Sequence, residues 1–165
     1  MNRIWAPWRI DYIKSEKEPG CIFCEMLEHG NDEEMLILKR GKKCFVVMNK
    51  YPYTNGHLMA VPYEHTRDLP NLDPETAAEL IELVKQCTAA LTGAMNPHGF
   101  NIGLNLGLVA GAGVEEHLHF HIVPRWNGDN NFMPVLADCR VINEHIGETY
   151  LHLKKQFEKI DGNQE

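Results

Sequence analysis

The stretch EEHLHFHIVPRW, residues 115–126, alternates three histidines with three apolar residues: His117, His119 and His121 with Leu118, Phe120 and Ile122. Side chains along a β-strand point alternately to its two faces. The pattern therefore predicts a strand, ending at Pro124, that carries the imidazoles on one face and core residues on the other. A helix would scatter the three rings around its circumference, and the β-branched and aromatic neighbours also favour a strand.

Seven further segments show patterns of regular structure. Strands are expected at 35–40, 43–49, 57–62 and 99–105, and helices at 22–29, 74–95 and 141–160. Asp73 can cap the second helix, and Pro74 suits its first turn. These segments predict an α+β fold: about five antiparallel strands in a meander-like sheet, covered by two main helices.

The chain length of 165 residues suits one domain. We expect a single domain, 1–165, with an N-terminal arm at 1–20 and a C-terminal helix and tail at 141–165. No apolar run approaches the ~20 residues that span a bilayer, so no membrane partner is expected. The net charge of −7 also argues against a nucleic acid partner, because nucleic acids are bound by basic surfaces.

The N-terminus and the cysteines indicate the compartment. The first residues contain no apolar signal core, which argues against secretion. The five cysteines are an odd number, and three of them lie in apolar segments: Cys44, Cys87 and Cys139. This usage is typical of reduced thiols, so we expect a cytoplasmic protein without a disulfide framework.

The histidine row indicates a chemical role because it directly follows a glycine-rich loop, GLVAGAG at 107–113. A metal site or an exposed polar face is the alternative, since imidazole is a common metal ligand. His119, the middle ring, is the expected nucleophile because its neighbours can orient it. The loop glycines let backbone N–H groups approach an anion, and Asn105 adds an amide donor. Such a site suits phosphoryl or nucleotidyl transfer.

HLHFHIV, residues 117–123, fits the motif of the histidine triad (HIT) superfamily of nucleotide hydrolases and transferases, His-φ-His-φ-His-φ-φ with φ apolar. The resemblance extends over roughly 35–135, and VMNKYPYTNGHLMAVPYEH at 47–65 resembles the ribose and base pocket of that family. Three segments resemble the branch of diadenosine tetraphosphate phosphorylases more closely: RIWAPWRIDYI at 3–13, HGFNIGLNLG at 98–107 and EEHLHFHIVPRWNGDNNF at 115–132.

The resemblance implies that His119 attacks the α-phosphorus of a dinucleoside polyphosphate and forms a nucleotidyl-histidine, which orthophosphate or water then cleaves. The carbonyl of His117 would select the tautomer of His119. His121 would contact the phosphates near the leaving oxygen, and His57 would support the network from a neighbouring strand. The remaining substrate contacts would be Asn49 at the ribose, Asn105 with the backbone of Gly111, Ala112 and Gly113 at the phosphates, and Trp126 either against a base or against a partner subunit.

The chain departs from the family at 112–114. Many members have a Gln or Ser side chain just before the triad, where this chain reads Ala112-Gly113-Val114. No polar side chain is available there, so backbone amides would have to substitute.

Cys21-Ile22-Phe23-Cys24 is a CxxC motif that suits zinc in a reducing cytosol, although zinc needs two more ligands. Two free buried cysteines are the alternative, and a redox motif lacks a thioredoxin-like βαβ pattern around it. Part of the superfamily, and the similar galactose-1-phosphate uridylyltransferases, hold structural zinc with two Cys and two His. The resemblance places these ligands at Cys21, Cys24, His65 and His117. Magnesium bound with the substrate phosphates is a further expectation.

These observations lead us to expect phosphorolysis of diadenosine tetraphosphate to ADP and ATP. The resemblance also implies a homodimer whose two sheets form a continuous one. One alternative is hydrolysis of dinucleoside polyphosphates or nucleoside phosphoramidates by the same His119. The other is a nucleotide-binding protein without catalytic activity.

Overall fold

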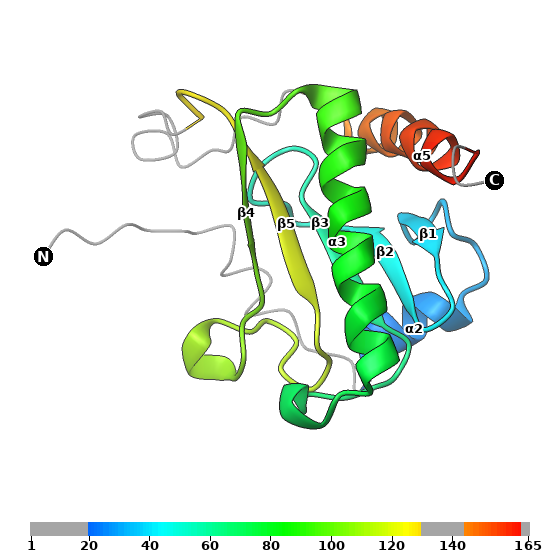
Figure 1. Cartoon of the computed structure of the whole chain (residues 1–165), viewed down its shortest axis with the longest axis vertical. Coiled ribbons are helices and arrows are strands. Elements are labelled where there is room, and N and C mark those ends of the chain that lie inside the picture. The colour runs from blue at the N-terminus through cyan, green and yellow to red at the C-terminus, as the bar shows by residue number, and fades with distance from the viewer. Residues whose placement is uncertain (1–19, 130–143, 163–165) are drawn as a thin grey trace, which may run out of the picture.

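Five antiparallel strands form one open sheet in the computed structural model of the chain, which describes residues 20–129 and 144–162 (Figure 1). The strands are β1 (Ile37–Arg40), β2 (Cys44–Met48), β3 (Leu58–Pro62), β4 (Gly99–Gly103) and β5 (Phe120–Arg125). Their order in the sheet is β1-β2-β3-β5-β4. The expected α+β architecture with five antiparallel strands is confirmed.

The strand order departs from a simple meander because β5 lies between β3 and β4. Both β3 and β4 pair antiparallel with β5, so they run in the same direction. Two strands in the same direction cannot be joined by a tight turn and need a crossover. Helix α3 (Pro74–Met95) supplies that crossover, and the chain then returns to place β5 in the gap.

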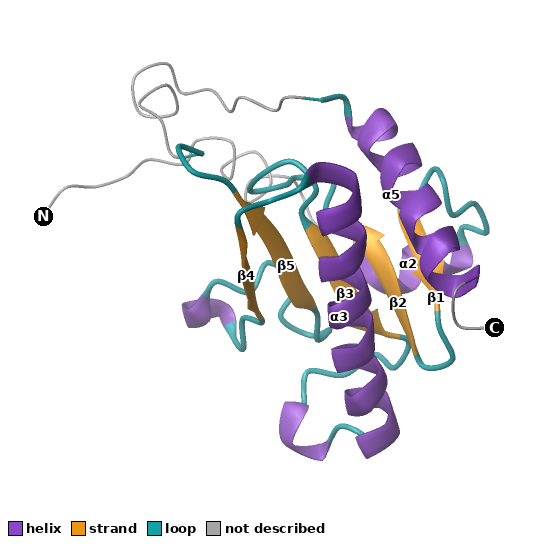
Figure 2. Cartoon of the chain, turned by 45° about the horizontal axis from the view of Figure 1, so that its top comes forward, coloured by secondary structure: helices purple, strands orange, loops and turns teal. Residues whose placement is uncertain are grey.

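Helices cover both faces of the sheet. Figures 1 and 2 show α3 and α5 (Ile146–Gly162) on one face and the short α2 (Ile22–Glu28) on the other. Asp73 caps α3 as expected, since its carboxylate accepts the N–H of Thr76 at 3.1 Å. The predicted C-terminal helix begins at Ile146 among the described residues. Two 3-10 turns complete the described structure, at Leu69–Asn71 and Leu108–Ala110.

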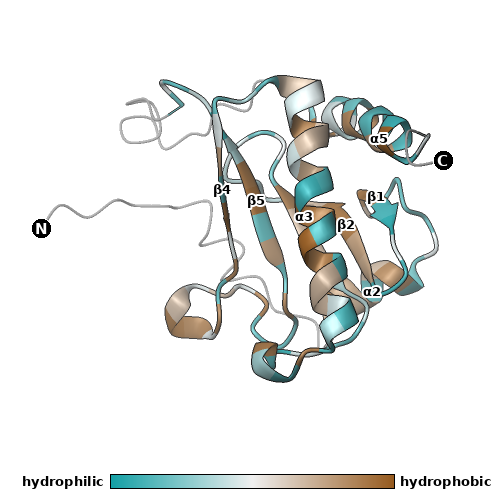
Figure 3. Ribbon diagram, in the orientation of Figure 1, coloured by the Kyte–Doolittle hydropathy of each residue, from teal (hydrophilic) through white to brown (hydrophobic). Residues whose placement is uncertain are grey.

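Alternate residues of the strands enter two separate cores. In β2, Cys44, Val46 and Met48 pack with α3 and α5. Phe45 and Val47 point to the opposite face and cluster with Phe23 of α2. Figure 3 shows the result as hydrophobic colour along β2 and mixed colour along α3, whose outer face meets solvent. Both faces of β2 and β3 are buried, because all ten of their residues belong to the interior.

Several predictions concern residues outside the described ranges, namely the arm at 1–19, Cys139 and the start of the last helix at 141–143. The four described cysteines are all free thiols. Among the described residues, no helix combines the length and the apolar character needed to cross a membrane.

Candidate active site and metal centre

The histidine row lies partly before the strand that was expected to carry all of it. Strand β5 begins at Phe120, so of the three histidines only His121 is within it. Pairing with β3 stops at Ala60–Phe120, two residues before Pro62. A proline has no N–H to donate to a neighbouring strand, so Pro62 cannot extend this ladder. The N–H of Leu118 bonds instead to the carbonyl of Thr66, at 2.7 Å.

The alternation of side chains nevertheless persists through the irregular part. Ile122 is fully buried in the core beneath α3, Phe120 packs against that core, and Leu118 is buried as well. The three imidazoles point to the face that α2 covers. The rings of His119 and His121 meet edge to face with their centroids 4.8 Å apart. Phe23 contacts both His117 and His119.

His117 faces the CxxC motif and is completely buried. Its Nε2 lies 2.9 Å from the carbonyl of Pro62, which can only accept a hydrogen bond, so Nε2 carries the proton. Its Nδ1 is therefore unprotonated, and it lies 3.2 Å from the sulfur of Cys21. Burial lowers the pKa of His117, and the nearby rings of His65 and His119 lower it further. This neutral imidazole presents a lone pair to the two cysteines.

Four side chains converge at this point, with their ligand atoms all within 4.8 Å of one another: Cys21, Cys24, His65 and His117. The sulfur of Cys24 lies 3.4 Å from Nδ1 of His65 and 3.8 Å from Nδ1 of His117. Sulfur and nitrogen ligands on a tetrahedral zinc ion are about 3.6 Å apart. Both the donor set and its spacing therefore fit zinc. The magnesium ion expected with the substrate has no support among the described residues.

His119 has the opposite tautomer from His117. Its Nδ1 donates to the backbone carbonyl of His117 at 2.8 Å, the contact that the sequence resemblance predicted. The ring is 6% exposed and lines a pocket on the α2 face of the sheet. Burial lowers the pKa of His119, which favours the neutral ring. Its Nε2 therefore carries a lone pair, the form in which an imidazole is a nucleophile.

His57 and His121 form a hydrogen-bonded pair beside this ring. Nδ1 of His57 accepts the backbone N–H of Tyr53 at 3.2 Å and lies 3.3 Å from the amide nitrogen of Asn49. With Nδ1 accepting, the proton of a neutral His57 is on Nε2, which lies 3.0 Å from Nδ1 of His121. The proton of a neutral His121 is then on Nε2, where it can be donated to a ligand.

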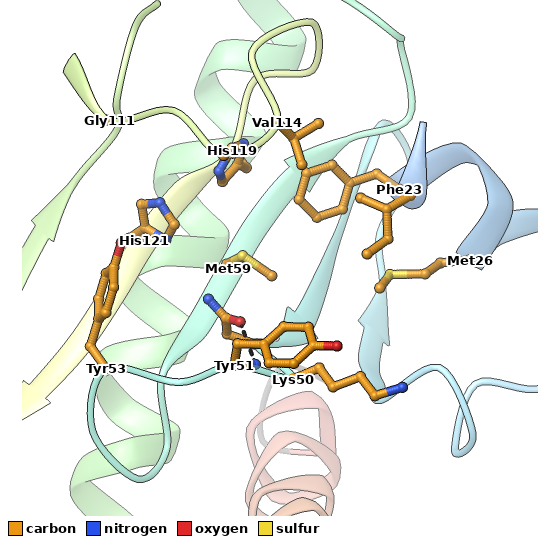
Figure 4. A pocket seen from close by; sticks show the side chains of 13 residues that line it. Phe23, Met26, Lys50, Tyr51, Tyr53, Met59, Gly111, Val114, His119 and His121 are labelled. Carbon is orange, nitrogen blue, oxygen red and sulfur yellow. Dashed lines mark hydrogen bonds between the residues drawn. The ribbon is translucent and has the colours of Figure 1, made fainter. Parts of the chain in front are cut away.

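One pocket joins His119 and His121 to α2. Five apolar side chains line it: Ile22, Phe23, Met26, Met59 and Val114. Figure 4 shows Phe23, Met26 and Val114 on one side and Tyr53 and His121 on the other, with His119 between them. Asn49, Lys50 and Tyr51 also line the pocket. An apolar slot that ends in polar groups suits a nucleobase attached to a ribose and phosphates.

The glycine-rich loop does not offer all of its backbone amides to a ligand. The N–H of Gly111 donates to the carbonyl of Leu108 at 2.9 Å, and the N–H of Ala112 donates to Gly107 at 3.3 Å. Both N–H groups are therefore bonded to carbonyls at the start of the 3-10 turn Leu108–Ala110. In this conformation both N–H groups are engaged within the loop, and their contact with phosphates stays a prediction. Gly111 and Gly113 still line the pocket, whereas Ala112 does not.

The other predicted contact residues are placed unequally. Asn49 lines the pocket, and Asn105 lines an adjacent groove along β4 and β5 together with His121. Asn105 donates to the carbonyl of Gly111 at 3.4 Å, which links the groove to the loop. Trp126 lines neither the pocket nor the groove. It follows the end of β5, five residues beyond His121 and therefore roughly 15 Å along the chain.

The sequence patterns did not indicate Tyr53 or the apolar side chains that α2 contributes to the pocket, Ile22, Phe23 and Met26. The CxxC motif could have indicated these residues. If Cys21 and Cys24 lie close to His117, then Ile22 and Phe23, which stand between the two cysteines, must lie near His117 as well. Tyr53 lay within a segment recognised as pocket-forming, but no pattern distinguished it from Tyr51.

Comparison with known proteins agrees with this geometry. A family model for the HIT domain matches residues 31–128. The AP-4-A phosphorylase of Mycobacterium tuberculosis is 39% identical over 158 residues, covering 90% of this chain and 80% of that protein. The adenosine 5′-monophosphoramidase hnt1 of Schizosaccharomyces pombe is 31% identical over 108 residues, covering 66% of this chain and 76% of that protein.

A solved structure supports the same assignment. The crystal structure of a zinc-bound histidine triad family protein from Mycobacterium smegmatis matches with a TM-score of 0.71 and 25% identity, covering 87% of this chain and 97% of that one. The family model spans more than half of the chain and includes the whole histidine row. The chain therefore belongs to the HIT domain family.

Proposed function

We propose that this HIT enzyme transfers a nucleotidyl group from a dinucleoside polyphosphate to orthophosphate, with diadenosine tetraphosphate as substrate and ADP and ATP as products. The observation that carries the proposal is the hydrogen bond from Nδ1 of His119 to the carbonyl of His117, which leaves Nε2 as the nucleophile in the pocket. The 39% identity to a protein named AP-4-A phosphorylase supports the choice of substrate and acceptor.

The residues divide the work in two half-reactions. Nε2 of His119 attacks the α-phosphorus, the bond to the bridging oxygen breaks, and ATP leaves with that electron pair. His121 donates its Nε2 proton as a hydrogen bond to the phosphates, and His57 holds it in that tautomer. An oxygen of orthophosphate then attacks the adenylyl-histidine to form ADP, and the lone pair returns to His119.

Product analysis tests the proposal directly. The protein is incubated with diadenosine tetraphosphate with and without phosphate, and the nucleotides are separated by chromatography. ADP and ATP formed only with phosphate support the phosphorylase. AMP and ATP formed without phosphate would show a hydrolase instead, and binding without turnover would show a non-catalytic protein. An acid quench followed by mass spectrometry should find adenylate on the peptide that contains His119.

We further propose that Cys21, Cys24, His65 and His117 hold one structural zinc ion. Their ligand atoms lie within 4.8 Å of one another, and four protein ligands leave no open position for substrate. When bound, the ion would cross-link α2 to the segments that carry His65 and His117. Elemental analysis of protein that was never exposed to a chelator should find about one zinc per chain; an absence of zinc would contradict the site.

A second candidate activity is hydrolysis of nucleoside phosphoramidates by the same His119. It is favoured by the 31% identity to a protein named adenosine 5′-monophosphoramidase. Comparing kcat/KM for adenosine 5′-phosphoramidate and diadenosine tetraphosphate decides between the two activities. A higher value for the phosphoramidate would reverse our order of preference.

A homodimer with a continuous sheet also remains a proposal. Strand β4 ends the sheet, and its residue Ile102 is 47% exposed, so a second copy could pair along this edge. Light scattering after size-exclusion chromatography should give twice the chain mass of 18.9 kDa.

A further inference from the structure

We infer that the hydroxyl of Tyr53 is a further catalytic group, which donates a hydrogen bond to the leaving polyphosphate beside His121. The inference rests on the proposed function, because it assigns a role in the same nucleotidyl transfer. It concerns a residue outside the histidine row that contacts His57 through its backbone and its ring, and His121 through its ring.

Tyr53 is held against the histidine pair through both its backbone and its ring. Its N–H donates to Nδ1 of His57 at 3.2 Å, and its ring stacks on His57 with centroids 4.7 Å apart and planes inclined by 21°. The same ring lies 6.0 Å from that of His121. Figure 4 shows the hydroxyl end of Tyr53 turned toward His121, at the side of the pocket opposite Phe23.

Tyr53 lies where the pocket under α2 meets the groove along β4 and β5. Tyr53 and His121 line both the pocket under α2 and the groove along β4 and β5. Its neighbour Thr54 donates to the carbonyl of Pro124 at 2.9 Å, which ties this loop to β5. A nucleotide with its base in the pocket and its polyphosphate in the groove would pass the side chain of Tyr53, which is 39% exposed.

The segment just before the histidine row supplies few donors. Residues Ala112, Gly113 and Val114 have no polar side chains, and the amides of Gly111 and Ala112 donate within their own loop. Lys50 extends away from His121 toward the other end of the pocket (Figure 4). The net charge of −7 also gives no overall attraction to a polyphosphate. The phenol of Tyr53 adds a neutral donor next to His121, in the same groove as Asn105 and Arg125.

The chemical step is balanced without a proton transfer from Tyr53. The bond between Nε2 of His119 and the α-phosphorus forms as the bond from that phosphorus to the bridging oxygen breaks. The electron pair stays on the bridging oxygen, which becomes a terminal oxygen of the departing ATP. The hydroxyl of Tyr53 keeps its proton and hydrogen-bonds the oxygens on which negative charge increases. A donor aimed at developing charge lowers the barrier more than it strengthens substrate binding.

Tyr53→Phe removes only the hydroxyl and keeps both the ring stack and the backbone N–H. The rate of the first half-reaction is measured as the burst of ATP from diadenosine tetraphosphate without phosphate. We expect this rate to fall roughly 10- to 100-fold, with little change in KM. The same variant is then tested with the p-nitrophenyl ester of AMP, whose leaving group has no phosphates. With that ester the loss should be less than about threefold, because the charge on the departing phenolate is spread into the nitrophenyl ring and the leaving group has no phosphate oxygens for the hydroxyl to contact.

Tyr150→Phe is the matched control, since Tyr150 lies in α5 and donates its hydroxyl to the carbonyl of Ile37 at 3.1 Å. It should lower the melting temperature and leave both rates unchanged. Equal losses on the two substrates for Tyr53→Phe, or no loss on either, would overturn the inference. If wild-type protein releases no ATP from diadenosine tetraphosphate but does cleave the ester, the proposed substrate is wrong, and the role of Tyr53 is refuted with it.

Discussion

His117 and His119 lie two residues apart on the same side of the sheet, and both touch Phe23, yet they present opposite nitrogens. His117 donates from Nε2 to the carbonyl of Pro62 and turns Nδ1 toward the cysteines. His119 donates from Nδ1 to the carbonyl of His117 and keeps Nε2 for the pocket. The role of each ring is therefore decided by which of its nitrogens meets a backbone carbonyl.

This difference shows how one short motif can serve two purposes. The carbonyl of His117 selects the tautomer of His119, the proposed nucleophile, while the side chain of His117 belongs to the group of four proposed zinc ligands. A zinc ion at the cluster would therefore restrain the same residue that orients His119. The two regions can still be separated experimentally, because substitutions can remove one side chain without touching the other.

The largest effect is expected from His119→Ala. The substitution removes the nucleophile and leaves the metal cluster intact, so turnover of diadenosine tetraphosphate should fall by roughly 10⁴-fold or more. Zinc content and nucleotide binding should stay near wild type, as measured by elemental analysis and calorimetry. Activity above a few per cent of wild type would refute His119 as the nucleophile.

The second-largest loss of activity is expected from a substitution of His57, the hydrogen-bond partner of His121. His57→Phe keeps an aromatic ring for Tyr53 to stack on but removes the donor to Nδ1 of His121. We expect kcat to fall by about 10²-fold because His121 loses its preferred tautomer. Ring nitrogen NMR shifts of His121 should report the change of tautomer. An unchanged kcat together with unchanged shifts would contradict the proposal that His57 sets the tautomer of His121.

The metal side of the comparison is tested by Cys24→Ser. The substitution should abolish zinc binding and destabilise the fold by about 4 kcal/mol, the order of magnitude for a ligand at a thousand times its Kd, which lowers the melting temperature by roughly 10 °C. The loss of kcat should remain far below that of His119→Ala. The opposite ranking, with full stability and lost catalysis, would show that the cluster serves the chemistry.

The smallest effect is expected from a substitution of Phe23, the residue that contacts both His117 and His119. Phe23→Leu removes the ring that packs on both histidines and should cost about 1–2 kcal/mol in urea unfolding. Phe45→Leu is a suitable control, because Phe45 lies in the same core but stacks on Tyr63 instead. The two variants should lose similar stability, and only Phe23→Leu should weaken binding of AMP. Equal affinities would show that Phe23 is purely structural.

Local patterns were sufficient for most secondary structure. Helix α3 begins at Pro74 with Asp73 as its cap, as the sequence indicated, because capping depends only on residues close together in the chain. The start of β5 could not be predicted in this way. It depends on Pro62, which lies on another strand and cannot supply the N–H that the expected pairing requires.

The sequence by itself determined the histidine spacing and the face that the rings share, since these follow from local periodicity. It also supplied the CxxC pair, whereas the two histidine ligands were expected only from the family resemblance. Only the tertiary structure decided which nitrogen His117 presents, because the carbonyl of Pro62 that selects its tautomer lies on β3. The tautomer of His119 depends on the nearby carbonyl of His117 and was expected from the family resemblance. The tertiary structure also decided that β5 lies between β3 and β4, and that the ring of Tyr53 lies against those of His57 and His121. Contacts between residues distant in sequence depend on how the strands pair, and that pairing is a property of the whole chain.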